Sequence, residues 1–249
     1  MTEVLFFYLY IYYNKLKEVD YMKPYVICHM LMSIDGKVTG RFLHDERSQE
    51  AIEYYYEINR NLTKDAIALG RVTMEESFTK GYYPDLSKYD TKILKEDYIE
   101  DSNYNKYMIA FDRKGKLGYT SNLIKDEDEG YNNFKIIEVL TKDVSLAYLS
   151  YLRNLGISYI FAGENDLDMK LALNKLYRLF NIKRIVLEGG SIINGAFLKD
   201  DLVDEISLVV VPLIADYNDK LLFYNSEIKG FKLEKIEKIN NFIHVIYRR

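Results

Sequence analysis

The sequence predicts an α/β fold with a mixed, mostly parallel β-sheet and antiparallel strands at its C-terminal end. Short apolar runs of strand length alternate with segments of helical spacing between residues 25 and 199. This alternation is typical of units in which a helix crosses over between two parallel strands. The last strand-like segments, residues 205–212 and 231–247, have no helix of comparable length between them, so antiparallel strands are expected there.

A single large domain is expected over residues 23–249, preceded by an extension over residues 1–22. A chain of 249 residues can bury one substantial core, and no linker rich in Ser, Pro and Gly divides it. Met22 directly precedes the first strand, and the apolar run over residues 4–13 is too short to cross a bilayer as a helix. The extension is therefore expected to be peripheral, or else to pack against a partner.

The elements of the first half follow from apolar runs and their polar boundaries. Strands are expected at residues 25–32, 66–69, 107–111 and 136–140, and a helix at residues 48–61. A short helix can start after Gly70, a loop-rich insertion covers residues 81–105, and a charged turn over residues 112–115 closes the third strand.

The second half continues the alternation. A helix over residues 145–155 is expected to stop at Gly156, because glycine readily takes the left-handed conformation of a helix C-terminus. Strands at residues 159–162 and 183–187 enclose an amphipathic helix over residues 167–180. Residues 193–199 can open one more helix after the last of these strands.

Composition excludes several classes of protein. The formal charge of −4 provides no basic footprint for nucleic acid. The lone Cys28 rules out an intramolecular disulfide framework, and the lack of a signal peptide with a cleavage site predicts a cytoplasmic protein. One cysteine also cannot supply the ligand set of a zinc deaminase.

Neither the acidic residues nor the histidines predict a metal site. Residues 126–129 are consecutive carboxylates in a loop, which is typical of a solvated segment. His29, His44 and His244 lie far apart and lack the spacing of metal ligands, so each is expected to be structural or on the surface. Cys28 lies within the first strand, where a small buried side chain is expected.

The segment Glu188-Gly189-Gly190 is the most informative turn, since it joins a buried strand to a helix. Glycines at such a turn permit positive φ and a close approach of the backbone, and the N–H groups of the helix start attract phosphate. An anion is therefore expected to dock there. The alternative is an ordinary bend in which the glycines serve only the turn.

Five motifs in a fixed order resemble the riboflavin-biosynthesis reductase domain, the RibD C-terminal family, over residues 23–249. They are Ser33-Ile34-Asp35-Gly36-Lys37, the segment 65–73, Glu188-Gly189-Gly190, Asn194-Gly195-Ala196-Phe197-Leu198 and Leu202-Val203-Asp204-Glu205. The resemblance implies a dihydrofolate reductase-like fold, a twisted mixed sheet flanked by helices, in a homodimer. It also implies an NADPH-dependent oxidoreductase that reduces a phosphoribosylaminopyrimidine, 5-amino-6-(5-phosphoribosylamino)uracil, at the sugar C1′.

The resemblance also implies roles for individual residues. Glu188 would face the substrate, and Asp35 and Lys37 would orient the sugar and manage its proton. Arg113 follows a strand and is expected to pair with the 2′-phosphate of NADPH. The remaining cofactor-binding residues would be Leu31, Ser33, Gly70, Thr73, Gly189, Gly190, Ser191, Ile192, Ile193 and Asn194.

The chain departs from the family pattern where the ribose phosphate would bind. After Thr73 it lacks the Asp-Asp-Pro-x-Leu-Thr run, and Asn61 stands where an arginine is expected. The nearest cations that would compensate are Arg41, Arg60 and Lys80. Two alternatives therefore stay open: a reductase of this fold for another pteridine, imine or carbonyl substrate, and a nucleotide-binding module without turnover.

Overall fold

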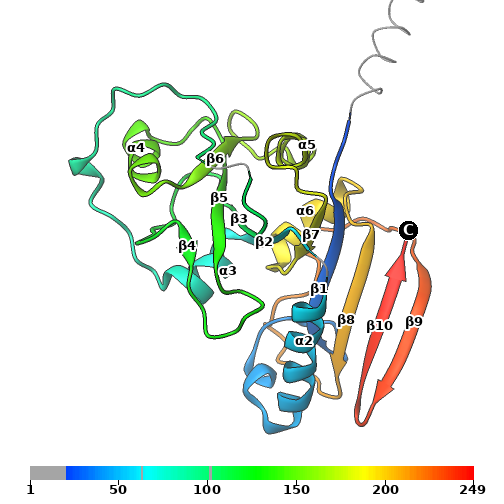
Figure 1. Cartoon of the computed structure of the whole chain (residues 1–249). Helices are drawn as coiled ribbons and strands as arrows, with labels where there is room; N and C mark the ends of the chain where they lie inside the picture. The colour runs from blue at the N-terminus through cyan, green and yellow to red at the C-terminus, as the bar shows by residue number, and fades with distance from the viewer. Residues whose placement is uncertain (1–20, 63, 101–102) are drawn as a thin grey trace, which may run out of the picture.

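The fold is a ten-stranded sheet with helices on both faces, seen in a computed structural model that describes residues 21–62, 64–100 and 103–249 (Figure 1). The strand order is β4-β5-β3-β2-β7-β1-β8-β10-β9, and β6 pairs with β5 beside β4. The C-terminal hairpin of β9 and β10 forms one edge of the sheet. The predicted extension, residues 1–22, falls almost entirely outside the described residues.

The strands follow the expected positions closely. Their bounds are β1 (Tyr25–Ser33), β2 (Ala66–Gly70), β3 (Tyr107–Phe111), β4 (Leu123–Ile124), β5 (Phe134–Leu140), β6 (Ser158–Phe161), β7 (Arg184–Leu187), β8 (Glu205–Val211), β9 (Lys232–Ile239) and β10 (Phe242–Arg248). Pairs within the central sheet are parallel, whereas β8, β10 and β9 pair antiparallel, as does the short β4 with β5. The predicted mixed, mostly parallel sheet with antiparallel C-terminal strands is confirmed.

The helices also match, with one instructive difference. Their bounds are α2 (Gln49–Asn61), α3 (Arg71–Met74), α4 (Leu146–Leu155), α5 (Met169–Phe180) and α6 (Ser191–Lys199), with short helical turns at Arg41–His44, Glu46–Ser48, Glu75–Thr79 and Leu86–Lys88. Gly156 ends α4 in the left-handed conformation, as expected. Helix α6 begins two residues before the predicted Ile193, because the extended Gly190 serves as its N-cap.

The alternation of side chains along the strands divides the core between the two faces of the sheet. On one face, α5 and α6 cover a cluster that includes Met30 and Leu187. On the other face, α2 covers a small cluster around Leu31, and α4 covers a separate cluster around Met108.

Leu187 belongs to the cluster under α5 and α6. The residue after it therefore points to the opposite face, which α2 and α4 cover. This residue is Glu188, which contacts Asn59 of α2 and Tyr131 of the Met108 cluster. Among the residues that the structure describes, no helix has the length and hydropathy needed to cross a membrane.

Candidate active site

The two glycine-containing turns predicted to hold a cofactor lie against each other. Strands β2 and β7 pair in parallel, with Ala68 opposite Leu187, so the turns that follow them emerge side by side. The backbone N–H of Gly70 donates to the carbonyl of Gly189 over 2.7 Å. A Cβ atom placed on Gly190 would lie 3.2 Å from Oγ1 of Thr73. These four residues form one cradle at the carboxyl ends of the two strands.

The start of α6 opens onto this cradle without a capping side chain. Gly190 is the N-cap, and the first turn carries no acidic residue. The N–H groups of a first helical turn have no acceptors within the helix, and they favour an anion. Ile192 is 73% exposed at this helix start, whereas Ile193 is buried in the core.

The helix start is held by the segment 221–224. The hydroxyl of Ser191 donates to the carbonyl of Leu221, and Nδ2 of Asn194 donates to the carbonyl of Leu222 over 3.3 Å. Oδ1 of the buried Asn194 has no hydrogen-bond partner among the described residues. Ser191 and Asn194 thus position the helix start through their side chains, and the backbone N–H groups are left for a ligand.

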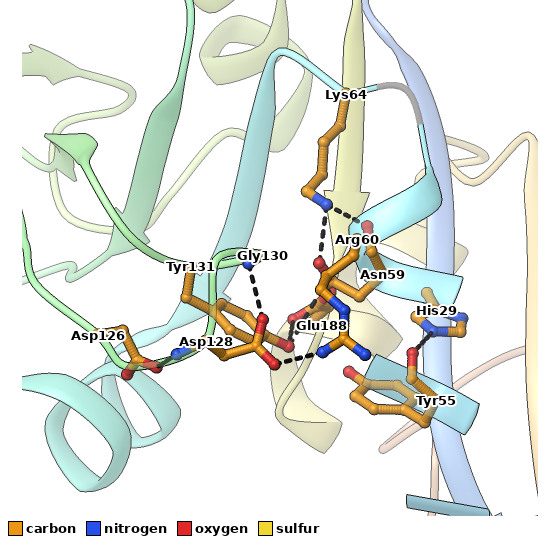
Figure 2. A network of polar contacts seen from close by, with 10 residues as sticks. All are labelled: His29, Tyr55, Asn59, Arg60, Lys64, Asp126, Asp128, Gly130, Tyr131 and Glu188. Atoms are coloured by element: carbon orange, nitrogen blue, oxygen red, sulfur yellow. Dashed lines mark hydrogen bonds and ion pairs between the residues drawn. The ribbon is translucent and has the colours of Figure 1, made fainter. Parts of the chain in front are cut away.

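Glu188 lies directly before the cradle and is 7% exposed. The Tyr131 hydroxyl donates to its Oε2 over 2.8 Å, and Nδ2 of Asn59 donates to its Oε1 (Figure 2). Burial raises the pKa of the Glu188 carboxyl from 4.5 to about 7, against hydrogen bonds from Tyr131, Asn59 and Tyr55 and the charge of Lys64. A carboxyl group with such a pKa can exchange a proton near neutral pH.

Tyr131 reaches Glu188 from the acidic loop that the sequence predicts to be solvated. Within this loop, Asp128 accepts the N–H of Gly130 over 2.7 Å and pairs with Arg60 of α2 over 2.6 Å. Figure 2 shows this ion pair beside Tyr131 and Glu188. The loop is therefore docked onto α2, and its acidic residues have a structural role as well as solvent contact.

Asp35 and Lys37 lie apart from Glu188. Cys28 of β1 pairs with Leu187, and β1 continues for five more residues to Ser33, a distance of about 16 Å. Asp35 is exposed and accepts hydrogen bonds from the Ser33 hydroxyl at 2.6 Å and from the N–H of residue 215 at 3.1 Å. These bonds, the Ser33 hydroxyl first, hold the pKa of Asp35 below its usual value.

Lys37 and Leu31 are occupied by contacts with neighbouring segments. The Lys37 ammonium donates to the carbonyls of Tyr217 at 3.0 Å and Asp219 at 2.8 Å. Leu31 is buried beneath α2 and pairs with Val209. The structure therefore gathers Gly70, Thr73 and residues 188–191 in one place, while Asp35 and Lys37 form a second group beyond the end of β1.

The cations considered for phosphate recognition all have partners on the protein. Arg113 pairs with Asp166, and Arg41 pairs with Asp216 over 3.0 Å. Lys80 donates to the carbonyl of its own helical turn.

Four side chains around Glu188 belong to none of the sequence motifs. Tyr55 and Asn59 occupy ordinary positions on an amphipathic helix, Lys64 lies in a connection, and Tyr131 follows an acidic loop. The only sequence signal is their polarity or aromaticity beside apolar strands. Their convergence depends on tertiary structure.

His29 and His244, far apart in the sequence, are joined through Ser207. The Ser207 hydroxyl lies 3.0 Å from Nδ1 of His29 and 2.9 Å from Nε2 of His244. The His29 ring stacks on Tyr55 with centroids 4.4 Å apart, and its Nε2 lies 3.1 Å from the Tyr55 carbonyl. The predicted structural role fits both residues. His29 also supports Tyr55 beside Glu188.

The stability of the protein is expected to fall in mild acid because of His29. Burial lowers the pKa of its imidazole from 6.5 to about 4. Between pH 4 and pH 6.5 the unfolded chain binds a proton at His29 that the folded chain does not. The contribution of His29 to the free energy of unfolding is therefore complete above pH 6.5 and is lost as the pH falls toward 4. It amounts to about 2 kcal/mol between pH 8 and pH 5.

Denaturant unfolding of the wild type and of His29→Gln across pH 4 to 8 measures this contribution. The raised pKa of Glu188 acts in the opposite direction in both proteins, so only the difference in slope reports on His29. Identical slopes would contradict the prediction.

Comparison with known proteins agrees with this geometry. The protein-family model named RibD C-terminal domain matches residues 24–245 of this chain. The 2,5-diamino-6-ribosylamino-4(3H)-pyrimidinone 5′-phosphate reductase of Aquifex aeolicus is 26% identical over 232 residues, which cover 91% of this chain and 90% of the relative.

Two solved structures show the same fold. A pyrimidine reductase-like protein of Corynebacterium diphtheriae superposes with a TM-score of 0.64 at 19% identity, covering 90% of this chain and 91% of that one. The RibD protein of Acinetobacter baumannii gives a TM-score of 0.62 at 19% identity, covering 91% of this chain but 58% of that longer one. The predicted dihydrofolate reductase-like fold is confirmed. The chain therefore belongs to the family of the RibD C-terminal domain, an oxidoreductase family of riboflavin biosynthesis.

Proposed function

We propose that this protein uses NADPH to reduce 2,5-diamino-6-ribosylamino-4(3H)-pyrimidinone 5′-phosphate at the sugar C1′. The observation that carries the proposal is the position of Glu188, a buried carboxyl one residue before the cradle of Gly189 and Gly190. A group that can exchange a proton thus lies beside a site suited to a dinucleotide diphosphate.

The choice of pyrimidine refines the expectation from sequence. The motifs indicate a reductase of a riboflavin precursor and imply the deaminated uracil form as its substrate. The Aquifex relative, which matches this chain over nearly its whole length, is named for the diamino form. We therefore propose the diamino form, whose reduction requires no deaminase domain.

Membership in this reductase family implies a nicotinamide cofactor, and the cradle fits one. The cradle lacks a side chain at Gly190, where a Cβ would crowd Thr73, and the first turn of α6 offers N–H groups without a capping side chain. Ser191, Ile192 and Ile193 would hold the diphosphate through these groups. When bound, the cofactor supplies the hydride.

The protein's own groups then bind and orient the substrate. Glu188 would hold a polar hydrogen of the substrate, and burial strengthens this interaction because water is excluded. Arg113 remains the proposed partner of the 2′-phosphate. This arginine is half exposed and already paired with Asp166, so the phosphate would displace or share an exposed ion pair that contributes little to stability.

Arg60 is the proposed cation for the substrate phosphate, since Figure 2 shows it beside Glu188 and its side chain is partly exposed. It would turn from Asp128 toward the substrate. A homodimer and a cytoplasmic location complete the proposal, and light scattering of the purified protein tests the former.

Turnover assays test the function directly. Purified protein is mixed with NADPH or NADH and with either the diamino substrate or its deaminated uracil analogue, and nicotinamide absorbance is followed. We expect faster oxidation with NADPH and with the diamino substrate. Binding of NADPH without turnover of either pyrimidine would contradict the proposal and favour a reductase of another substrate.

A further inference from the structure

The side chains that form hydrogen bonds with Glu188 share one property: each of them donates to the carboxyl. Tyr131 donates through its hydroxyl and Asn59 through its amide nitrogen. A carboxylate accepts on both oxygens, whereas a protonated carboxyl must itself place one proton. This arrangement is suited to an ionised Glu188.

Lys64 determines which way the amide of Asn59 points. The Lys64 ammonium lies 2.7 Å from Oδ1 of Asn59 and also donates to the backbone carbonyl of that residue. An ammonium group has donors only, so the amide oxygen must face Lys64. The NH₂ group of Asn59 is thereby turned toward Glu188.

The same NH₂ group also fixes the hydroxyl proton of Tyr131. Nδ2 of Asn59 lies 3.2 Å from the Tyr131 oxygen, which therefore accepts from Asn59. The hydroxyl proton is left to point at Glu188. Lys64 thus sets the direction of the hydrogen bonds that Asn59 and Tyr131 donate to Glu188. Figure 2 shows these residues together.

We propose that Lys64 is a positioning residue, which acts through Asn59 and Tyr131 to keep Glu188 ionised and fixed in orientation for its substrate. This inference deepens the proposed function. Only the identity of the substrate rests on that proposal. A positive charge at Lys64 offsets part of the cost of burying the carboxylate. Lys64, in the connection between α2 and β2, would then have a role in the reaction without contacting the substrate.

Lys64 is the cation whose charge acts on the Glu188 carboxyl within the described part of the chain. The titratable groups that face it come from two elements, β1 and α2, and from two connections. They are Cys28 from β1, Tyr55 and Tyr56 from α2, Lys64 from the connection after α2, and Tyr131 from the acidic loop. The others are neutral at pH 7, because burial raises the pKa of each thiol and phenol.

Two variants of Lys64 separate charge from packing. In Lys64→Met the pKa that governs the acid side of the kcat profile is expected to rise by about one pH unit, which lowers kcat at pH 6 about tenfold. Lys64→Arg keeps the charge and should retain a profile near that of the wild type. KM for NADPH should stay within twofold in both. Lys170→Met, at an exposed lysine on α5, is the matched control and should leave the profile unchanged.

A measurement without substrate keeps this inference separate from the proposed function. Carbon-13 NMR of glutamate-labelled protein follows the ionisation of Glu188, whose signal is assigned by its loss in Glu188→Gln. The titration should move to higher pH in Lys64→Met, and also in Tyr131→Phe, which removes one donor and serves if the lysine variant does not fold.

An unchanged Glu188 titration in Lys64→Met would overturn the inference, even if the enzyme reduces the proposed substrate. A shifted titration in Lys64→Met that Lys64→Arg restores would support it, even if the substrate assignment failed. A shift of equal size in both lysine variants would also overturn it, because packing rather than charge would then be responsible.

Discussion

Glu188→Gln is expected to lower kcat for the diaminopyrimidinone phosphate by about 100-fold or more, the usual effect of removing a group that exchanges a proton in a reaction. Glutamine has nearly the same shape but cannot take up or release a proton at neutral pH. The amide also brings an NH₂ group among side chains that only donate to Glu188, so one hydrogen bond is lost. Steady-state kinetics at several pH values measure the effect.

The affinity for NADPH should change little in this variant, because the glycine cradle is untouched. Glu57→Gln is the matched control, since Glu57 lies on α2 with its side chain exposed. A Glu188→Gln enzyme with at least a third of the wild-type kcat would exclude a direct role for the carboxyl.

Gly190→Val is expected to weaken NADPH binding by about 100-fold, which corresponds to the loss of one or two charge-assisted hydrogen bonds. The first atom of the new side chain would lie 3.2 Å from Oγ1 of Thr73, and the branches would fill the space in front of the α6 N-terminus. The backbone of Gly190 has φ of −72°, which any residue can adopt, so the variant should fold.

Calorimetric titration with NADPH measures the affinity, and thermal unfolding checks the fold. Gly230→Val is the matched control, because a Cβ on Gly230 would meet no atom within 4 Å. Unchanged NADPH affinity in a folded Gly190→Val protein would move the diphosphate site elsewhere.

The sequence by itself determined the fold and the place of the cradle. Strand β3 has the predicted bounds, Ser145 and Gly156 delimit α4, and Glu188 stands at the end of a strand beside two glycines. These features are local: hydrophobic period, capping and turn chemistry all act within a few residues. The order of five such motifs was sufficient to identify the family.

Only the tertiary structure decided what surrounds the carboxyl. Asn59, Lys64 and Tyr131 are separated from Glu188 by between 57 and 129 residues, and no periodicity relates them. The same holds for Arg60, which pairs with Asp128, and for Asp35, which lies beyond the end of β1. Hydrogen bonds between side chains of different elements depend on the register and packing of the whole sheet. Local sequence therefore predicted where the candidate site lies, and long-range packing determined which side chains surround Glu188.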